Sequence, residues 1–294
     1  MNTYWSTYVQ ETQELYNSRA LRFHDSNKDL WLKALQVQNG MNVLEVGCGG
    51  GIFCHRIKTY LPDVTITGLD RDAGHIEFAQ AKTKELGLDC NFVCGDATAL
   101  PFDDKTFDLC YSHTVMSFCE PDLFTAEQYR VLKPGGKMVV MCVIGGAERP
   151  EQWKPDDKCE EKELFDRLWN EADKNELSNI KRFDDDETHA FIYLERHGFK
   201  NISADVLAAL TYAPDCANVS DEMALAQINE NRLLELCSAH KANRIAPNAL
   251  SPGEFEELLA IINRRWDYRI EKYRRSEKTW GYNVSTVLAI SGTK

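Results

Sequence analysis

Residues 43–51 read VLEVGCGGG, an apolar run that passes directly into a cluster of glycines. This pattern predicts a buried strand and a tight turn, followed by a helix from about Ile52 to Tyr60. Glycine lets a ligand approach the main chain closely, and the first N–H groups of a helix favour an anionic or polarised group. Because the carboxylate of Glu45 lies beside the turn, the stretch predicts a site for a ligand with a positive or hydroxyl-bearing part.

The spacing of these glycines does not fit the dinucleotide-binding fingerprint. Gly47, Gly49 and Gly51 form G-x-G-x-G, whereas the third glycine of G-x-G-x-x-G would fall at Ile52, or at Cys54 if the count begins at Gly49. From this stretch alone, an ordinary connection between a strand and a helix is the alternative to a ligand site.

Strands and helices alternate through the first half of the chain. Further strands are predicted at residues 64–70, 90–94, 106–112 and 137–144, and helices at 72–86 and 120–132. The strands are almost continuously apolar, which is typical of a parallel sheet covered by helices on both faces. Ligands of such sheets bind beyond the carboxyl ends of the strands, where Glu45, Asp70, Asp96 and His113 all fall. Asp70 is expected to accept the hydroxyls of a ribose or, alternatively, to cap the next helix.

Composition and charge limit the partners. The chain has 294 residues and a net charge of −12, which disfavours a long, nonspecific contact with nucleic acid. The first residues lack the features of a signal peptide, and no stretch approaches the roughly 20 apolar residues of a membrane helix. Ten cysteines are scattered without a C-x-x-C pair, so buried, reduced thiols are expected rather than a metal site or disulfides. We therefore expect a cytoplasmic protein that binds neither nucleic acid nor a membrane.

Four segments, in this order, resemble the class I S-adenosylmethionine-dependent methyltransferases, especially those that act on small molecules. They are VLEVGCGGG at 43–51, GLD at 68–70, GDATALPFDDKTFDL at 95–109 and YRVLKPGGKMVV at 129–140. The resemblance covers roughly residues 40–145. It implies an α/β fold with a Rossmann-like doubly wound sheet of seven strands, mostly parallel. The last strand, at 282–290, would lie antiparallel beside a sixth at 199–207.

The resemblance also implies the cofactor, S-adenosylmethionine, and the residues that contact it. The glycine turn would line the methionine portion, Asp70 would hold the ribose hydroxyls, and Asp96 would accept from the amino group of the adenine. Arg71 departs from the apolar residue that is common after the ribose acid, although its stem can cover the adenine face. The expected contacts are Glu45, Gly47, Cys48, Gly49, Asp70, Arg71, Asp96, Ala97, His113 and Tyr16.

His113 is the candidate catalytic residue. The resemblance places it after the fourth strand, facing the sulfonium of the cofactor and the substrate. Imidazole titrates near neutral pH, so His113 would serve as a general base for a hydroxyl or amine nucleophile. The alternative is that it only contacts the cofactor.

Helical segments are predicted around this domain, and the whole chain, 1–294, is expected to be a single methyltransferase domain. Residues 3–36 are helical in pattern and dense in aromatic side chains, so 1–38 would pack on the sheet or cover the ligand as a lid. Insertions at 145–187 and 209–280 would form a cap over the substrate or a dimer interface. They are expected to contain a helix at 160–177 and another that opens with the capping box Ser251-Pro252-Gly253-Glu254.

Two charged clusters stand out in the insertions. Basic residues recur between Arg264 and Arg275, which predicts a solvated helix face, with an anion site as the alternative. Asp184, Asp185 and Asp186 follow one another, which favours the start of a helix over a metal site.

These features predict an enzyme that transfers a methyl group from S-adenosylmethionine to an O, N or C nucleophile of a small molecule. One alternative is a regulatory protein that binds the cofactor without chemistry. Another is a methyltransferase that acts on a protein or on nucleic acid. Residues 112–115 read SHTV and not the Asn/Asp-Pro-Pro-Tyr/Phe tetrapeptide of a nucleic-acid methyltransferase, which disfavours nucleic acid.

Overall fold

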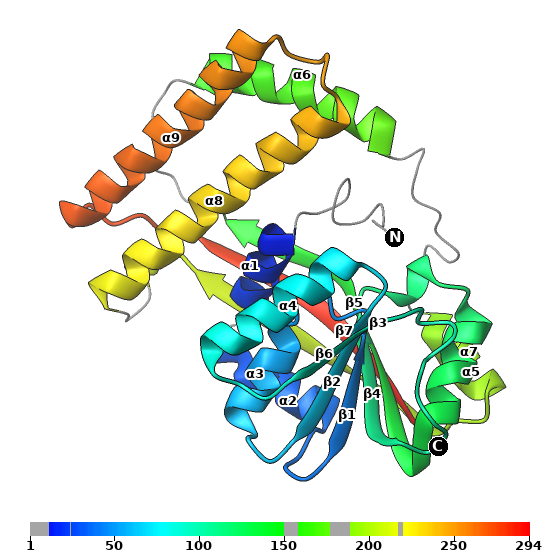
Figure 1. Cartoon of the computed structure of the whole chain (residues 1–294). Helices are drawn as coiled ribbons and strands as arrows, with labels where there is room; N and C mark the ends of the chain where they lie inside the picture. The colour runs from blue at the N-terminus through cyan, green and yellow to red at the C-terminus, as the bar shows by residue number, and fades with distance from the viewer. Residues whose placement is uncertain (1–11, 24, 150–157, 177–188, 217–219) are drawn as a thin grey trace.

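The computed structural model describes residues 12–23, 25–149, 158–176, 189–216 and 220–294. In these residues a seven-stranded sheet is flanked by helices, and a group of three further helices projects from one end of it (Figure 1). The strands are β1 (Asn42–Val46), β2 (Thr65–Asp70), β3 (Asn91–Cys94), β4 (Phe107–His113), β5 (Leu132–Arg149), β6 (Lys200–Tyr212) and β7 (Tyr282–Thr293). The α-helices are α1 (Thr12–Arg22), α2 (Lys28–Leu35), α3 (Ile52–Tyr60), α4 (Ala73–Leu86), α5 (Pro121–Val131), α6 (Lys158–Glu176), α7 (Ala190–Arg196), α8 (Asp221–Ile245) and α9 (Pro252–Arg274).

The sheet has the strand order β3-β2-β1-β4-β5-β7-β6. The first five strands are parallel, and β7 lies antiparallel between β5 and β6. The predicted sheet of seven strands with an antiparallel last strand is confirmed. Because the order reverses beside β1 and β4, the carboxyl ends of these strands border the crevice in which such sheets bind ligands.

Two layers of helices cover the sheet. One face packs against α1 to α4, and its core includes Trp31, Phe53 and Ile57. The other face packs against α5 and α7 through Phe124 and Leu194. Both faces of the central strands are therefore buried, which explains the nearly continuous apolar runs in β1 and in residues 138–142 of β5.

Strands β5, β6 and β7 run beyond the rest of the sheet as a three-stranded ribbon. The pairing of β5 with β7 extends to Arg149 opposite Tyr282, and that of β6 with β7 to Tyr212 opposite Tyr282. Within the ribbon, a Cβ at Gly146 would overlap the carbonyl of Val284, so only glycine fits there. The sequence predicted shorter strands, because the polar and glycine-rich ends of the ribbon lack the apolar pattern of a buried sheet.

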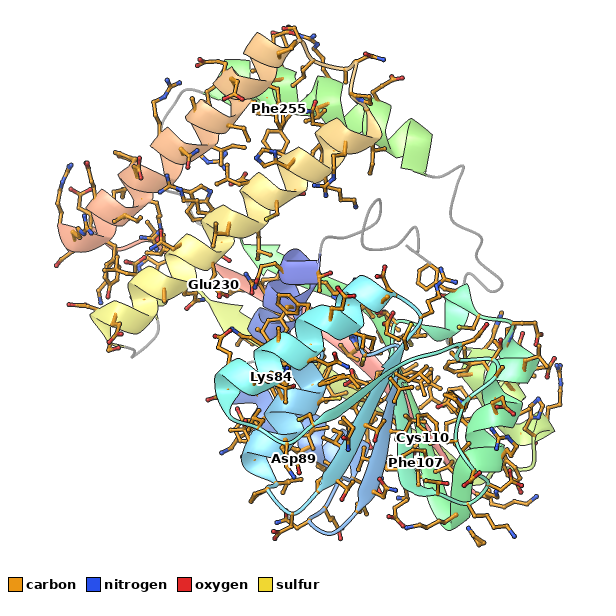
Figure 2. The ribbon with its side chains drawn as sticks, viewed as in Figure 1. Lys84, Asp89, Phe107, Cys110, Glu230 and Phe255 are labelled. Atoms are coloured by element: carbon orange, nitrogen blue, oxygen red, sulfur yellow. The ribbon has the colours of Figure 1, made fainter. Side chains whose placement is uncertain are left out.

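The ribbon carries a three-helix unit made of α6, α8 and α9 (Figure 1). This unit has its own apolar core, and Figure 2 places Phe255 of α9 in it. Helix α9 begins as predicted: Ser251 Oγ accepts from the N–H of Glu254, and the Glu254 carboxylate accepts from the N–H of Ser251 at 2.7 Å. The predicted helix at 160–177 corresponds to α6.

The basic run of α9 is not uniformly solvated. Arg264 and Arg274 are exposed, but Arg265 and Arg269 are buried against the carboxylates of Glu235 and Asp215. The expectation of a solvated face was wrong for these two side chains, because acids from other segments of the chain neutralise them. The cluster at Asp184–Asp186, the first eleven residues and part of the predicted insertion at 145–187 lie outside the described residues.

Candidate functional site

A cavity of about 290 Å³ lies at the carboxyl ends of β1, β2, β3 and β4, with residues of α1 among its walls. This is the crevice that the topology predicts for a ligand. The cavity brings together every residue that the sequence singled out for the cofactor: Glu45, Gly47, Cys48, Gly49, Asp70, Arg71, Asp96, Ala97, His113 and Tyr16. Their roles toward a ligand remain predictions.

The glycine turn forms the wall of the cavity after β1. Gly47 and Gly49 adopt φ values of 75° and 51°, a region that favours glycine. A Cβ at Gly49 would lie 2.6 Å from Cδ2 of Leu15, so this glycine also allows α1 to approach. The N–H groups of Gly47 and Cys48 both donate to the carbonyl of Leu69, at 2.7 and 3.0 Å, which holds the turn across the end of β2.

Asp70 ties this turn to the segment after β2. Its Oδ2 accepts from the N–H of Gly49 at 2.8 Å, and its Oδ1 accepts from the N–H of Asp72 at 2.9 Å. Nδ1 of His75 lies 3.5 Å from Oδ1. Asp72, and not Asp70, is the N-cap of α4, because its side chain accepts from the N–H of Gly74. Asp70 is thus held at the cavity wall and does not cap the helix.

Glu45 is buried at the end of β1, with 3% of its surface exposed. Its Oε2 accepts two hydrogen bonds of 3.0 Å, from the hydroxyl of Tyr111 and from the thiol of Cys54. Burial raises the pKa of Glu45 to about 7, although the two hydrogen bonds oppose that rise. This carboxyl therefore changes its charge near neutral pH, where a cation in the cavity would favour the ionised form.

The loop after β3 forms the opposite end of the cavity. Oδ1 of Asp96 accepts from the N–H and the hydroxyl of Thr98, at 2.8 and 2.7 Å. These bonds fold the loop and leave Oδ2 of Asp96 available in a largely solvated position. Arg71 is exposed, so its aliphatic stem lies at the rim of the cavity.

His113 lies at the tip of β4 and is 7% exposed. Its ring packs edge-on against Phe23 with a centroid distance of 5.2 Å, and lies 5.8 Å from the ring of Phe53. The two aromatic rings hold the imidazole in place, and the side chain lines the cavity. Next to it, Arg19 of α1 donates to the hydroxyl of Thr114 at 3.3 Å.

The sequence analysis missed several polar residues of the cavity wall, among them Arg19, His75 and Thr114. A signal was available for Arg19, because it lies three positions after Tyr16 and so on the same face of a predicted helix. Thr114 has a φ of 56°, which single-sequence reasoning does not predict for a threonine.

Tyr16 is anchored to α3 and α4 through His55. Thr83 donates its hydroxyl hydrogen to the carbonyl of Ala79, so it accepts from Nε2 of His55, at 2.8 Å. Nδ1 of His55 then carries no proton and accepts from the hydroxyl of Tyr16 at 3.4 Å. Burial lowers the pKa of His55 to about 4, which keeps the ring neutral at pH 7.

Among the residues that the structure describes, no three His, Cys, Asp or Glu side chains are grouped so as to hold a metal ion. None of the helices within the same residues is both long enough and apolar enough to cross a bilayer.

Comparison with known proteins gives consistent matches. Residues 44–140 match a family described as a methyltransferase domain. The fatty-acid O-methyltransferase of Mycolicibacterium smegmatis is 44% identical over 102 residues, which are 33% of this chain and 35% of that protein. The 24-methylenesterol C-methyltransferase 2 of Arabidopsis thaliana is 35% identical over 125 residues, which are 41% of this chain and 33% of that protein. The chain thus spans only about a third of the length of these curated relatives.

Solved structures share the fold. Phosphoethanolamine N-methyltransferase 2 of Haemonchus contortus, in complex with phosphomonomethylethanolamine and S-adenosylhomocysteine, superposes with a TM-score of 0.54 at 14% identity. The superposition covers 99% of this chain and 59% of that one. At this identity the likeness concerns the fold alone.

Proposed function

We propose that this chain is a class I S-adenosylmethionine-dependent methyltransferase, which transfers a methyl group from S-adenosylmethionine to an O, N or C nucleophile of a small molecule. The match of residues 44–140 to a methyltransferase domain supports this proposal. The observation that carries the proposal is the convergence of three acids from successive strand ends, Glu45, Asp70 and Asp96, in one cavity beside the glycine turn.

The residues of the cavity fit this cofactor part by part. Glu45 would pair with the methionine ammonium and Arg19 with the methionine carboxylate, since a zwitterion needs one partner of each charge. Asp70, already held by two backbone N–H groups, would accept from the ribose hydroxyls. Asp96 has an oxygen that Thr98 does not occupy and would accept from the adenine amino group.

When bound, S-adenosylmethionine supplies a methyl carbon that its sulfonium has already activated. The task left to the protein is to align the acceptor with this carbon and to exclude water. Alignment of two reactants lowers the activation free energy by ~7–11 kcal/mol in well-positioned systems. His113 lies in an aromatic wall of Phe23 and Phe53 and would face the acceptor. Its neutral imidazole would take a proton from a hydroxyl or amine nucleophile, whereas a carboxylate acceptor needs no base.

We further propose that the acceptor has a substantial apolar part. Apolar side chains line the cavity beside His113, among them Phe53, Val115 and Phe118. Two relatives, at 44% and 35% identity, are a fatty-acid O-methyltransferase and a sterol C-methyltransferase.

Residues 12–22 would act as a lid over the cavity, and the three-helix unit would act as a cap. A cytoplasmic location and a homodimer remain predictions.

The test is a methyl-transfer assay with cofactor labelled in the methyl group. The panel contains fatty acids, sterols, small amines, a protein mixture and nucleic acid, and mass spectrometry detects the product. We expect label in a fatty acid or a sterol. Transfer only to protein or nucleic acid would contradict the proposed acceptor, and cofactor binding without any transfer would favour a regulatory protein.

A further inference from the structure

The carboxylate of Glu45 is held by two side chains that do not line the cavity. Tyr111 and Cys54 each place a hydrogen bond of 3.0 Å on the same oxygen, Oε2. Both donors have 0% of their surface exposed. Two donors on one oxygen restrict the rotation of the carboxylate, whose side chain reaches the cavity wall.

Three separate elements produce this arrangement. Glu45 lies directly opposite Tyr111 in the parallel pairing of β1 with β4, so their side chains point to the same face of the sheet. Cys54 lies in the first turn of α3, immediately after the glycine turn. The geometry of the turn therefore determines both the cavity wall and the position of the thiol behind it.

Both donors keep their hydrogen at neutral pH. Burial raises the pKa of the Cys54 thiol and of the Tyr111 hydroxyl well above their ordinary values. Three further titratable groups, Cys48, Cys90 and Asp70, act on the Glu45 carboxylate from the glycine turn and the ends of the neighbouring strands. Burial also raises the pKa of the Cys48 and Cys90 thiols. The ionised form of Glu45 is therefore favoured by the hydrogen bonds from Tyr111 and Cys54 and not by these neighbouring groups.

We propose that Tyr111 and Cys54 are positioning residues, which orient the Glu45 carboxylate and favour its ionised form so that the cavity accepts a ligand bearing an ammonium group at neutral pH. This inference rests on the proposed function, in which the ammonium is that of S-adenosylmethionine. Because the pKa of Glu45 is about 7, binding of such a ligand is expected to release a proton and to weaken as the pH falls below 7.

The test measures the affinity of the full chain for S-adenosylhomocysteine by calorimetry between pH 6 and pH 9. Each titration is repeated in two buffers of different ionisation enthalpy, so that proton release is counted. The variants Tyr111→Phe and Cys54→Ala each remove one hydrogen-bond donor to Glu45. The variant Cys54→Ser replaces the thiol donor with a hydroxyl donor. Cys110→Ala is the matched control, because Cys110 is adjacent to Tyr111, fully buried, and packs in the core on the opposite face of the sheet.

We expect Tyr111→Phe to weaken binding about tenfold at pH 7, as for the loss of one hydrogen bond to a charged group. The loss should shrink toward pH 9, where Glu45 ionises without help. Cys54→Ala should behave similarly, and Cys54→Ser and Cys110→Ala should stay close to the unmodified chain.

Two results would overturn the inference while leaving the proposed function intact. One is a loss of affinity that is the same at every pH, which would indicate altered packing. The other is unchanged affinity and proton release in both Tyr111→Phe and Cys54→Ala. Absence of binding by the unmodified chain at every pH would instead contradict the proposed function itself.

Discussion

Glu45 and Asp70 are two carboxylates of one cavity that differ in what surrounds them. Asp70 accepts from two backbone N–H groups, whereas the buried Glu45 accepts from the Tyr111 hydroxyl and the Cys54 thiol. The sequence predicted both as cofactor contacts, from their positions at strand ends and from the resemblance to methyltransferases. It did not predict their different environments, since Tyr111 and Cys54 reach Glu45 only when the strands and α3 have packed.

The burial of Glu45 predicts that Glu45→Gln stabilises the protein in the absence of ligand. The carboxyl has a pKa of about 7 when folded against 4.5 when unfolded, so the folded state holds the proton more tightly. Stability is therefore lost as the pH rises from 4.5 to 7, by up to about 3 kcal/mol at about 1.4 kcal/mol per pKa unit. Urea unfolding at pH 5 and pH 8 should show this loss in the unmodified chain and not in Glu45→Gln. The same loss in both proteins would contradict the prediction.

His113→Ala is predicted to lower turnover more than cofactor affinity. The side chain faces the cavity from between Phe23 and Phe53, so its removal affects the alignment of the acceptor and any proton transfer. Single-turnover rates and cofactor affinity are measured separately, and His240→Ala, in the three-helix unit, serves as the control. A normal rate with saturating acceptor would exclude His113 as a general base.

At the scale of elements, α1 reaches the cavity wall through specific contacts with α3 and α4. Tyr16 hydrogen-bonds to His55, which is fixed in turn by Thr83, and the Tyr16 ring lies 5.5 Å from that of Phe78. Sequence patterning predicted a helix here and left two roles open, packing on the sheet or covering the ligand. Tyr16 packs on the domain and also lines the cavity, and the covering of the ligand by α1 stays a prediction.

His55→Ala is predicted to loosen α1. Loss of the ring removes the acceptor for Tyr16 and part of its packing, so amide hydrogen exchange of residues 12–22 should accelerate at least several-fold, and cofactor affinity should fall. Tyr16→Phe removes only the hydroxyl and should give a smaller change in the same direction. Unchanged exchange in α1 for both variants would show that the hydrogen bond to His55 does not hold the helix.

The sequence predicted a helix or strand accurately where a local residue pattern marked its ends. The strands from β1 to β4 were predicted within one or two residues, because each is a short apolar run that ends at a turn. The capping box located the start of α9 exactly where it lies. The ribbon of β5, β6 and β7 was underestimated, since its outer residues pair only with one another, far apart in the sequence, and show no burial pattern.

At the scale of the whole molecule, the three-helix unit is joined to the sheet by the ribbon and by the approach of α8 to α1 (Figure 1). Glu230 of α8 is half-buried there, near Arg56 of α3 and Lys82 of α4 (Figure 2). This position supports the proposal that the unit caps the cavity through α1. The sequence suggested a cap or a dimer interface but gave no way to place α8 over α1.

Arg269→Ala is predicted to destabilise the junction of the unit with the ribbon. The guanidinium is fully buried against Asp215, which also accepts from the hydroxyl of Thr279 at 2.7 Å. Removing the cation leaves a buried carboxylate without its charge partner, which typically costs about 3–5 kcal/mol. Thermal unfolding should show a marked fall in melting temperature, whereas Arg274→Ala, on the exposed side of α9, should change it little. Equal melting temperatures would contradict the structural role of the pair.

The central claim is that the cavity beside the glycine turn binds S-adenosylmethionine through the acids at the strand ends. The most direct test is calorimetric titration of the cofactor into the unmodified chain, Asp70→Ala and Asp89→Ala. Asp89 is an exposed acid at the opposite, amino-terminal edge of the sheet (Figure 2). We predict that Asp70→Ala loses at least tenfold in affinity, as expected when a charged acceptor of hydrogen bonds is removed, and that Asp89→Ala binds like the unmodified chain. Equal affinity of all three proteins would contradict the account.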